Sequence, residues 1–325
     1  MVCTPSWSRY DAGMTTPTPE IIRAAASRIA GDVRRTPLWR LPGAALGLRC
    51  AEVWLKLEQL QVGGSFKARG MFNRLRSLPV PAAGVVVASG GNAGIAVATA
   101  AQALGVACEV FLPEMSSPAK RTALAALGAR VVVHGAAYVD ALAACLARQR
   151  ESGALLMHAY DQAEVVAGAG TLGGEIEDEA GLPERVLVSV GGGGLVAGVA
   201  AWFGGRCRVE ALEPALAPTL HAARAAGMPV DVAVAGVAAD SLGARRIGDI
   251  AWAAQRQGFI AASHLLDDAA IRDAQRRIWR ELRLAVEPAA ALPLAALWTG
   301  LVQPAAHERV AVIVCGANLD PASLA

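Results

Sequence analysis

The chain has 325 residues, 54% of them hydrophobic, which is enough for two well-filled cores. Thirty basic and 28 acidic residues leave a formal net charge of only +2, with no basic run, which argues against nucleic acid as a partner. No uninterrupted apolar stretch predicts a membrane span or a signal peptide, so we expect a cytoplasmic protein that acts on a small molecule.

The first predicted element is a helix that Thr18 caps, with Pro19 in its first position. Residues 53–58 then alternate between apolar and other side chains, and this period of two predicts a half-buried strand. From Val85 onward, short apolar runs alternate with helical stretches, an order typical of a parallel sheet covered by helices on both faces. The predicted strands are 85–88, 108–112, 130–134, 186–190, 207–212 and 309–314, and the predicted helices are 92–104, 118–127, 138–150, 195–202 and 267–284.

The strands form two series, and each series predicts one α/β unit. The strand at 53–58 is expected to return to the sheet of the second unit, which makes the larger domain discontinuous. We therefore predict a large domain of residues 1–76 and 163–325 and a small domain of residues 77–162.

A loop of small residues follows the strand at 53–58 and carries Ser65, Phe66 and Lys67. Ligands of open α/β sheets bind beyond the carboxyl ends of the strands, so this loop is a place to expect chemistry. A lysine held among small residues, partly out of water, loses some of its preference for the charged form, and a neutral amine can attack a carbonyl. The loop therefore predicts Schiff-base chemistry at Lys67.

Three further loops also follow predicted strands. The loop Ser89-Gly90-Gly91-Asn92-Ala93-Gly94 precedes a helix and is suited to hold a carboxylate or a phosphate on its backbone N–H groups, and Asn92 adds a side-chain donor. The four consecutive glycines Gly191 to Gly194 predict close approach of a phosphate, because a mere turn does not require so many glycines. The last loop is Cys315-Gly316-Ala317-Asn318.

The glycine loop at 191–197 also supports a rival interpretation. It matches a loose nicotinamide-dinucleotide fingerprint, with Glu210 or Glu213 about twenty residues further on. An NAD-dependent oxidoreductase therefore stays an alternative, although this interpretation gives no role to Lys67 or to the loop at 89–94.

In this order and at these separations, the four loops resemble those of the serine/threonine dehydratases among the fold-type II pyridoxal-phosphate enzymes. The resemblance runs from about Thr18 to Asp320 and includes Val286-Glu287-Pro288. It implies two doubly wound, three-layer α/β domains of the tryptophan synthase β type, with pyridoxal 5'-phosphate in the cleft between them, and it also implies a homodimer.

The resemblance further implies that Lys67 forms the Schiff base with the cofactor and removes the Cα proton of an amino-acid substrate. The other residues that it implies for the cofactor are Phe66, Asn92, Gly191, Gly192, Gly193, Gly194, Glu287 and Cys315. Those that it implies for the substrate are Ser65, Ser89, Gly90, Gly91, Asn92 and Ala93. The expected reaction is β-elimination from a hydroxyamino acid such as L-threonine or L-serine, giving a 2-keto acid and ammonia. Cys315 matches the pyridine-nitrogen contact, and a thiol is too weak a donor to hold a pyridinium proton, which favours elimination over reprotonation.

Departures from the family pattern bear on the alternatives. Serine racemases of this family carry a serine at the position of Gly90, and glycine offers no acid or base there. A racemase is therefore disfavoured and is kept as a second alternative. Glu213 matches one ligand of a divalent-cation site found in some members, but Thr219 stands where an aspartate is needed, and we predict no metal. An inactive amino-acid-binding relative is the third alternative, and the presence of Lys67 argues against it.

Overall fold

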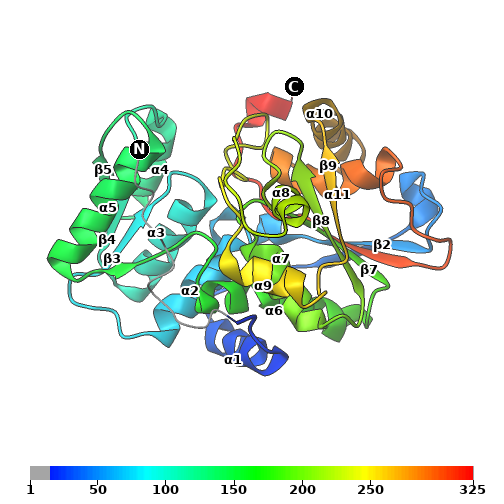
Figure 1. Cartoon of the computed structure of the whole chain (residues 1–325), viewed down its shortest axis with the longest axis horizontal. Helices are drawn as coiled ribbons and strands as arrows, with labels where there is room; N and C mark the ends of the chain where they lie inside the picture. The colour runs from blue at the N-terminus through cyan, green and yellow to red at the C-terminus, as the bar shows by residue number, and fades with distance from the viewer. Residues whose placement is uncertain (1–14, 325) are drawn as a thin grey trace.

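The computed structural model describes residues 15–324, and within them the strands form a six-stranded sheet and a four-stranded sheet. Figure 1 shows the two sheets in separate halves of an elongated molecule. The strand order is β1-β2-β10-β7-β8-β9 in the larger sheet and β5-β4-β3-β6 in the smaller one. Among the described residues every neighbouring pair is parallel except β1 with β2, which confirms the prediction of parallel α/β units.

The predicted strands form within two residues of their expected bounds. Runs such as Val85–Ala88 are β-branched and buried on both faces, as strands between two helical layers should be. The larger sheet contains β1 (Leu38–Pro42), β2 (Glu52–Lys56), β7 (Arg185–Ser189), β8 (Arg208–Pro214), β9 (Ala262–Leu266) and β10 (Arg309–Ile313). The smaller sheet contains β3 (Val85–Ala88), β4 (Cys108–Leu112), β5 (Arg130–Val133) and β6 (Leu155–Leu156).

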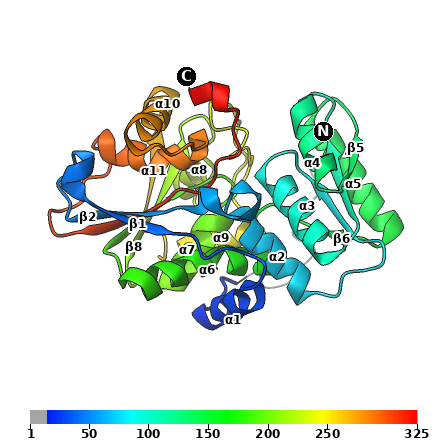
Figure 2. The same cartoon turned by 180° about the vertical axis from the view of Figure 1, so that it is seen from behind.

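Helices cover both faces of each sheet. Figures 1 and 2 place α10 and α11 on one face of the larger sheet and α6 and α7 on the other, and α3 and α5 both contact β3 and β4 of the smaller sheet. The Thr18 side chain accepts a hydrogen bond from the backbone of Ile21, which confirms the predicted cap. The helices are α1 (Pro19–Ile29), α2 (Lys67–Ser77), α3 (Asn92–Leu104), α4 (Pro118–Ala126), α5 (Tyr138–Ser152), α6 (Ala163–Ala180), α7 (Gly194–Phe203), α8 (Thr219–Ala226), α9 (Asp249–Arg256), α10 (Asp268–Arg277) and α11 (Pro288–Trp298).

Strand β2 returns to the larger sheet, as predicted, but the expectation that it is half-buried is wrong. Trp54, Lys56 and Glu58 have no exposed surface, although their alternation with apolar residues indicated a wet face. β2 lies between β1 and β10, and its Lys56 side chain points into the protein rather than into water. The ammonium of Lys56 is held by the Glu175 carboxylate at 2.6 Å, so an ion pair replaces solvent on that face.

The predicted helix at 267–284 is also shorter than expected. Helix α10 ends at Arg277, and a π-helical turn, Ile278–Leu282, follows it directly. Arg283 then takes a φ of 58°, a left-handed conformation that ends the helix. Local periodicity did not reveal this ending because the residue at the turn is not a glycine.

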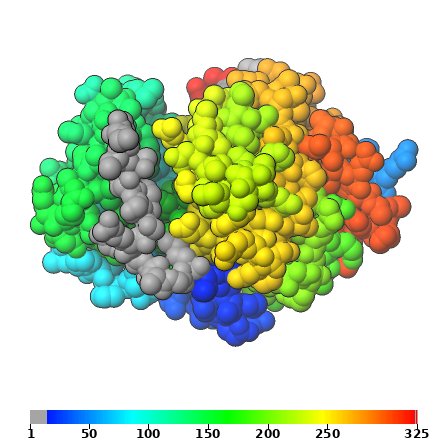
Figure 3. Space-filling view, in the orientation of Figure 1, coloured from blue at the N-terminus to red at the C-terminus, as the bar shows by residue number. Residues whose placement is uncertain are grey.

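Figure 3 shows the two halves as separate lobes, the smaller one in cyan and green. The strands of the smaller sheet fall between residues 85 and 156, while the domain bounds 77–162 stay a prediction. Within the described part of the chain, no helix is long and apolar enough to cross a membrane.

Candidate active site

The lysine loop and the cysteine loop are joined by backbone hydrogen bonds. Ser65 and Gly316 form an antiparallel bridge, Phe66 N donates to the Cys315 carbonyl at 3.1 Å, and Ala317 N donates to the Gly64 carbonyl at 2.9 Å. The two loops meet because they follow β2 and β10, which are neighbouring parallel strands. Two predicted site segments more than 240 residues apart in the chain are therefore one structural unit.

Lys67 is the first residue of α2, and its side chain is partly buried. Nζ donates a hydrogen bond to the Ala159 carbonyl at 2.5 Å and lies 5.1 Å from the centre of the Phe66 ring. Burial lowers the pKa of the Lys67 amine to about 8, although the nearby Cys315 and Glu287 oppose this shift. Its place at the positive end of a helix also disfavours the ammonium form. Lys67 can therefore present a neutral amine near neutral pH.

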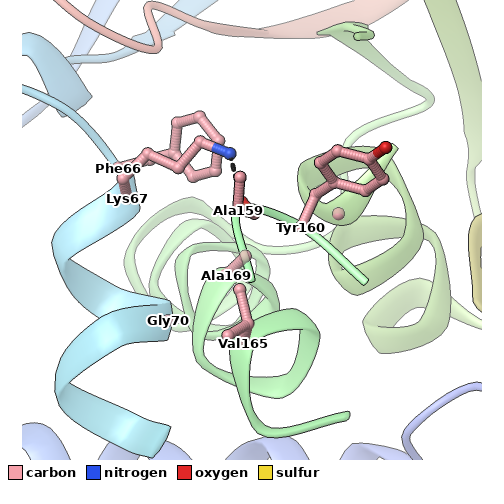
Figure 4. A pocket seen from close by; sticks show the side chains of 8 residues that line it. Phe66, Lys67, Gly70, Ala159, Tyr160, Val165 and Ala169 are labelled. Carbon is pink, nitrogen blue, oxygen red and sulfur yellow. Dashed lines mark hydrogen bonds between the residues drawn. The ribbon is translucent and has the colours of Figure 1, made fainter. Parts of the chain in front are cut away.

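Figure 4 shows the Lys67 amine and the Tyr160 ring facing the same small pocket. Its lining residues are Phe66, Lys67, Gly70, Ala159, Tyr160, Val165, Ala169 and Gly194. The lining thus includes both the predicted Schiff-base lysine and the last glycine of the predicted phosphate loop. The two features therefore lie beside the same small cavity.

Asn92 and Glu287 form the second part of the site. The Asn92 amide Nδ2 donates to both carboxylate oxygens of Glu287 at 2.9 Å, and the Cys315 thiol lies 4.0 Å from Glu287 Oε1. Burial raises the pKa of Glu287 to about 7, against the hydrogen bonds from Asn92 and Ser241 that favour the charged form. Burial, together with Glu287, raises the pKa of the Cys315 thiol well above its ordinary value. The predicted ring contact is consequently a thiol, not a thiolate.

The tetraglycine loop leads into the N-terminus of α7, where an α-helix leaves its first N–H groups without helical partners. Gly193 has a φ of 91°, which disfavours any other residue. A Cβ atom at Gly192 would lie 2.3 Å from the Tyr160 ring, and one at Gly194 would lie 2.6 Å from the Tyr160 carbonyl oxygen. The glycines are therefore needed both for the backbone conformation and for the close approach of residue 160.

The loop at 89–94 connects β3 to α3 in the smaller half. A Cβ atom at Gly91 would lie 3.2 Å from the carbonyl oxygen of Asp240, a residue of the larger half. Asp240 also forms an ion pair with Lys120 of α4, so the two halves meet beside this loop. Asn92 is hydrogen-bonded to Glu287, which belongs to the larger half. The binding of a substrate by Ser89, Gly90, Gly91 and Ala93 stays a prediction.

Ser65 has a buried hydroxyl with no hydrogen-bond partner among the described residues. A buried hydroxyl without a partner is costly, and it lies two residues before the amine of Lys67. An unsatisfied polar atom at this place suits a polar ligand held by the lysine loop. This observation supports the assignment of Ser65 to the site.

Glu213 is the weak candidate metal ligand, and its carboxylate is already used. It accepts hydrogen bonds from Leu220 N at 2.7 Å, His221 N at 2.9 Å and the Ser263 hydroxyl at 2.5 Å, which fixes the start of α8. Within the part of the chain that the structure describes, no group of three or more metal-ligating side chains comes together. Glu213 is therefore best described as a helix-capping residue.

The dinucleotide interpretation also meets an obstacle. It needs Glu210 or Glu213 to bind a ribose, but Glu210 is buried against Arg185, Arg208 and His264. Both carboxylates therefore have protein partners, and neither is available for a sugar hydroxyl.

Sequence reasoning assigned no site role to Ala159, Tyr160, Ser241 or Asn318. Ala159 and Tyr160 follow no predicted strand, and Ala159 acts through its carbonyl, so residue type carried no signal. Asn318 was part of the fourth loop motif, but its contacts with Gly63 and Asn92 depend on the tertiary fold. Together, the partly buried amine of Lys67, the glycine loop at a helix N-terminus and the unpartnered Ser65 hydroxyl fit an aldehyde cofactor that bears a phosphate.

Comparison with known proteins supports this assignment. A family model described as "Pyridoxal-phosphate dependent enzyme" matches residues 29–316. The phenylserine dehydratase of Ralstonia pickettii is 34% identical, over 96% of this chain and 97% of that protein. The L-threonine ammonia-lyase of Geobacter sulfurreducens is 35% identical, over 92% of this chain and 75% of that protein.

Maize serine racemase has a similar structure, with a TM-score of 0.87 and 30% identity over 95% of this chain and 96% of that chain. This likeness confirms the predicted fold-type II architecture, and the family match confirms pyridoxal 5'-phosphate as the cofactor. The chain therefore belongs to the pyridoxal-phosphate dependent enzyme family.

Proposed function

We propose that this protein catalyses β-elimination from a hydroxyamino acid, giving a 2-keto acid and ammonia. The observation that carries the proposal is the partly buried Lys67 amine, whose pKa is lowered to about 8 beside a small cavity that Gly194 also lines. An amine of this kind can bind an aldehyde covalently and, once released, can accept a proton from Cα. Pyridoxal phosphate, when bound, supplies the electron sink that makes this Cα proton acidic.

Each predicted residue has a defined task in this proposal. Lys67 holds the cofactor and takes the Cα proton, and the glycine loop at 191–194 binds the phosphate on its N–H groups. Asn92 donates to the phenolic oxygen of the cofactor, and the loop at 89–93, with Ser65, receives the substrate carboxylate. In net terms the substrate loses its β-hydroxyl as water, and the released enamine takes up water to give the keto acid and ammonia.

Elimination is favoured over racemization because Gly90 has no side chain that can exchange a proton on the face opposite Lys67. A Cβ atom built at Gly90 would lie 2.9 Å from Leu112 Cδ2, so a serine at this position would require Leu112 to move. Serine racemase activity is the alternative, because maize serine racemase shares the fold. The formation of D-serine from L-serine would distinguish the two activities.

The substrate class is proposed from the relatives together with the site. Two relatives with more than 30% identity are a phenylserine dehydratase and an L-threonine ammonia-lyase. Both names describe a β-hydroxyamino acid, one with an aromatic and one with a methyl substituent at Cβ. We therefore propose L-threonine, L-serine and L-threo-3-phenylserine as the substrates to compare.

The experiment is an absorbance spectrum of the purified holoprotein before and after each amino acid is added, with the keto acid measured in parallel. The near-visible band should be present in the wild type and absent in Lys67→Ala, and keto acid should accumulate only with the wild type. A protein that binds pyridoxal phosphate but releases no keto acid from any of the three substrates would contradict the proposal.

The attachment site can be tested independently of activity. Lysine occurs only at positions 56, 67 and 120 in this chain. Lys56 is buried in an ion pair and Lys120 is half-exposed, so they are matched controls for burial and for accessibility. Borohydride reduction followed by peptide mass mapping should place the pyridoxyl group on Lys67, and a label on Lys120 instead would contradict the assignment.

The homodimer and the cytoplasmic location are proposals that rest on the resemblance and on the composition. Sedimentation equilibrium of the holoprotein tests the first, with a mass near twice 33.3 kDa as the expected result. A monomer at micromolar concentration would contradict it.

A further inference from the structure

Asn318 occupies the point where three predicted site loops meet. Its side-chain Nδ2 donates to the Asn92 side-chain oxygen at 2.7 Å and to the Gly63 carbonyl at 2.9 Å. Gly63 belongs to the lysine loop, Asn92 begins α3 in the smaller half, and Asn318 follows β10 in the larger half. One side chain therefore joins segments from both halves of the molecule.

These contacts fix the orientation of the Asn92 amide between Asn318 and Glu287. Asn92 Oδ1 is engaged by Asn318, so Asn92 Nδ2 points the other way and donates to both oxygens of Glu287. If the amide turned over, its oxygen would face the Glu287 carboxylate, and its NH₂ group would face that of Asn318. Two acceptors would then oppose each other in a buried place, and so would two donors.

We propose that Asn318 is a positioning residue that holds the Asn92 amide with its NH₂ group toward the cofactor oxygen. This inference rests on the proposed role of Asn92 as a cofactor-binding donor. Asn318 does not touch the reacting atoms itself. Asn318 acts on cofactor binding through the orientation of the Asn92 amide. This amide has two orientations, related by a half-turn, and a substitution at 318 can change which one is favoured.

The glycine pair in the lysine loop makes room for this arrangement. A Cβ atom at Gly64 would lie 2.5 Å from Asn318 Oδ1, and Gly64 has a φ of 74°. A larger residue at 64 would therefore push the Asn318 side chain away as well as strain the backbone. The proposal accounts for a glycine at this position through its contact with Asn318.

The test compares Asn318→Asp and Asn318→Ala in the protein reconstituted with pyridoxal phosphate, without substrate. Aspartate has nearly the same shape but offers only acceptors when ionised, so it should turn the Asn92 amide over. We expect Asn318→Asp to shift the near-visible absorption maximum in the same direction as Asn92→Ala and to weaken pyridoxal phosphate binding about fivefold or more. Asn318→Ala should have a smaller effect, because it releases the amide without reversing it.

A double-mutant cycle separates positioning from a general structural role. In an Asn92→Ala background, Asn318→Asp should leave the spectrum and the cofactor affinity unchanged. The control is Asn73→Ala, because the Asn73 side chain likewise makes two hydrogen bonds, at 2.6 Å to Arg28 and 2.7 Å to Glu164. Asn73→Ala should lower stability but leave the absorption maximum unchanged.

An unchanged spectrum and affinity in Asn318→Asp would overturn the inference, as would effects that add fully to those of Asn92→Ala. The failure of the proposed function is distinguishable from this result. If no hydroxyamino acid yields a keto acid but the spectral coupling of the two asparagines holds, the positioning role stands without the proposed substrate class.

Discussion

The protein interior contains two groups of ionisable side chains, and their pKa values shift in different directions. The first is a structural cluster formed by Lys56, Glu58, Arg69 and Glu175. Arg69 donates to both oxygens of Glu58 at 2.8 Å and to those of Glu175 at 2.6 and 2.9 Å. The second is the site group formed by Lys67, Glu287 and Cys315, in which charges are near each other but not directly paired.

The same burial leads to different protonation states in the two groups. In the structural cluster, burial disfavours charge, yet the carboxylates hold the pKa of Arg69 above its ordinary value and Arg69 holds the pKa of Glu58 below its own. In the site group, burial moves the pKa of Lys67 down to about 8 and that of Glu287 up to about 7. Burial also lowers the pKa of Lys56 despite its ion pair with Glu175, so the contrast with the site group holds for Arg69 and Glu58, which pair with each other through two hydrogen bonds.

The largest expected effect comes from breaking the structural cluster. Arg69→Met would leave Glu58 and part of Glu175 buried without a counter-charge, so we expect the free energy of unfolding to fall by about 3 to 5 kcal/mol. Urea unfolding of the apoprotein measures this. The control is Arg40→Met, because Arg40 pairs with Glu52 at a half-exposed position and should cost at most about 1 kcal/mol. Equal losses for the two variants would contradict the comparison.

The next effect concerns Glu287 and the pH dependence of stability. Its folded pKa of about 7 is raised from an ordinary value of 4.5, so the native state binds more protons in this window. Its contribution to stability is fully present below pH 4.5 and is lost as the pH rises through 7. The loss amounts to about 3 kcal/mol for the full shift. Glu287→Gln should remove this contribution to the pH dependence.

The measurement is the free energy of unfolding of the apoprotein between pH 5 and 8, with the variant subtracted from the wild type at each pH. A difference that stays constant across this range would show that Glu287 keeps an ordinary pKa. In that case the site group would resemble the structural cluster, and the comparison would fail.

The smallest expected effect is on the rate at which the apoprotein captures pyridoxal phosphate. Only the neutral amine attacks the aldehyde, and a Lys67 pKa of about 8 makes the neutral fraction rise roughly tenfold between pH 7 and 9, with a plateau above. Stopped-flow absorbance follows the capture. The control is Nα-acetyl-lysine, whose side-chain amine is free, at the same cofactor concentration. A rate that keeps rising up to pH 10 would indicate an ordinary lysine.

Much of the fold was predictable because its strands and helices have strong local patterns. Val85–Ala88, Cys108–Leu112 and Asn92–Leu104 occur at the predicted bounds, since largely apolar strand-length runs alternate there with helical stretches. β2 was misjudged for a physical reason. A charged residue in a strand usually faces water, but Lys56 faces Glu175 of α6, more than a hundred residues away.

The sequence by itself determined the α/β alternation, the four loops at strand ends and the lysine among small residues, because each is a property of neighbouring residues. Tertiary structure alone decided which charged groups are paired, since Glu58, Arg69 and Glu175 come from three separate segments. It also decided the direction of the Asn92 amide, which depends on Asn318, 226 positions along the chain. Burial and pairing are set by long-range packing. Burial lowers the pKa of both Lys56 and Lys67, while the Glu175 carboxylate pairs with Lys56 at 2.6 Å.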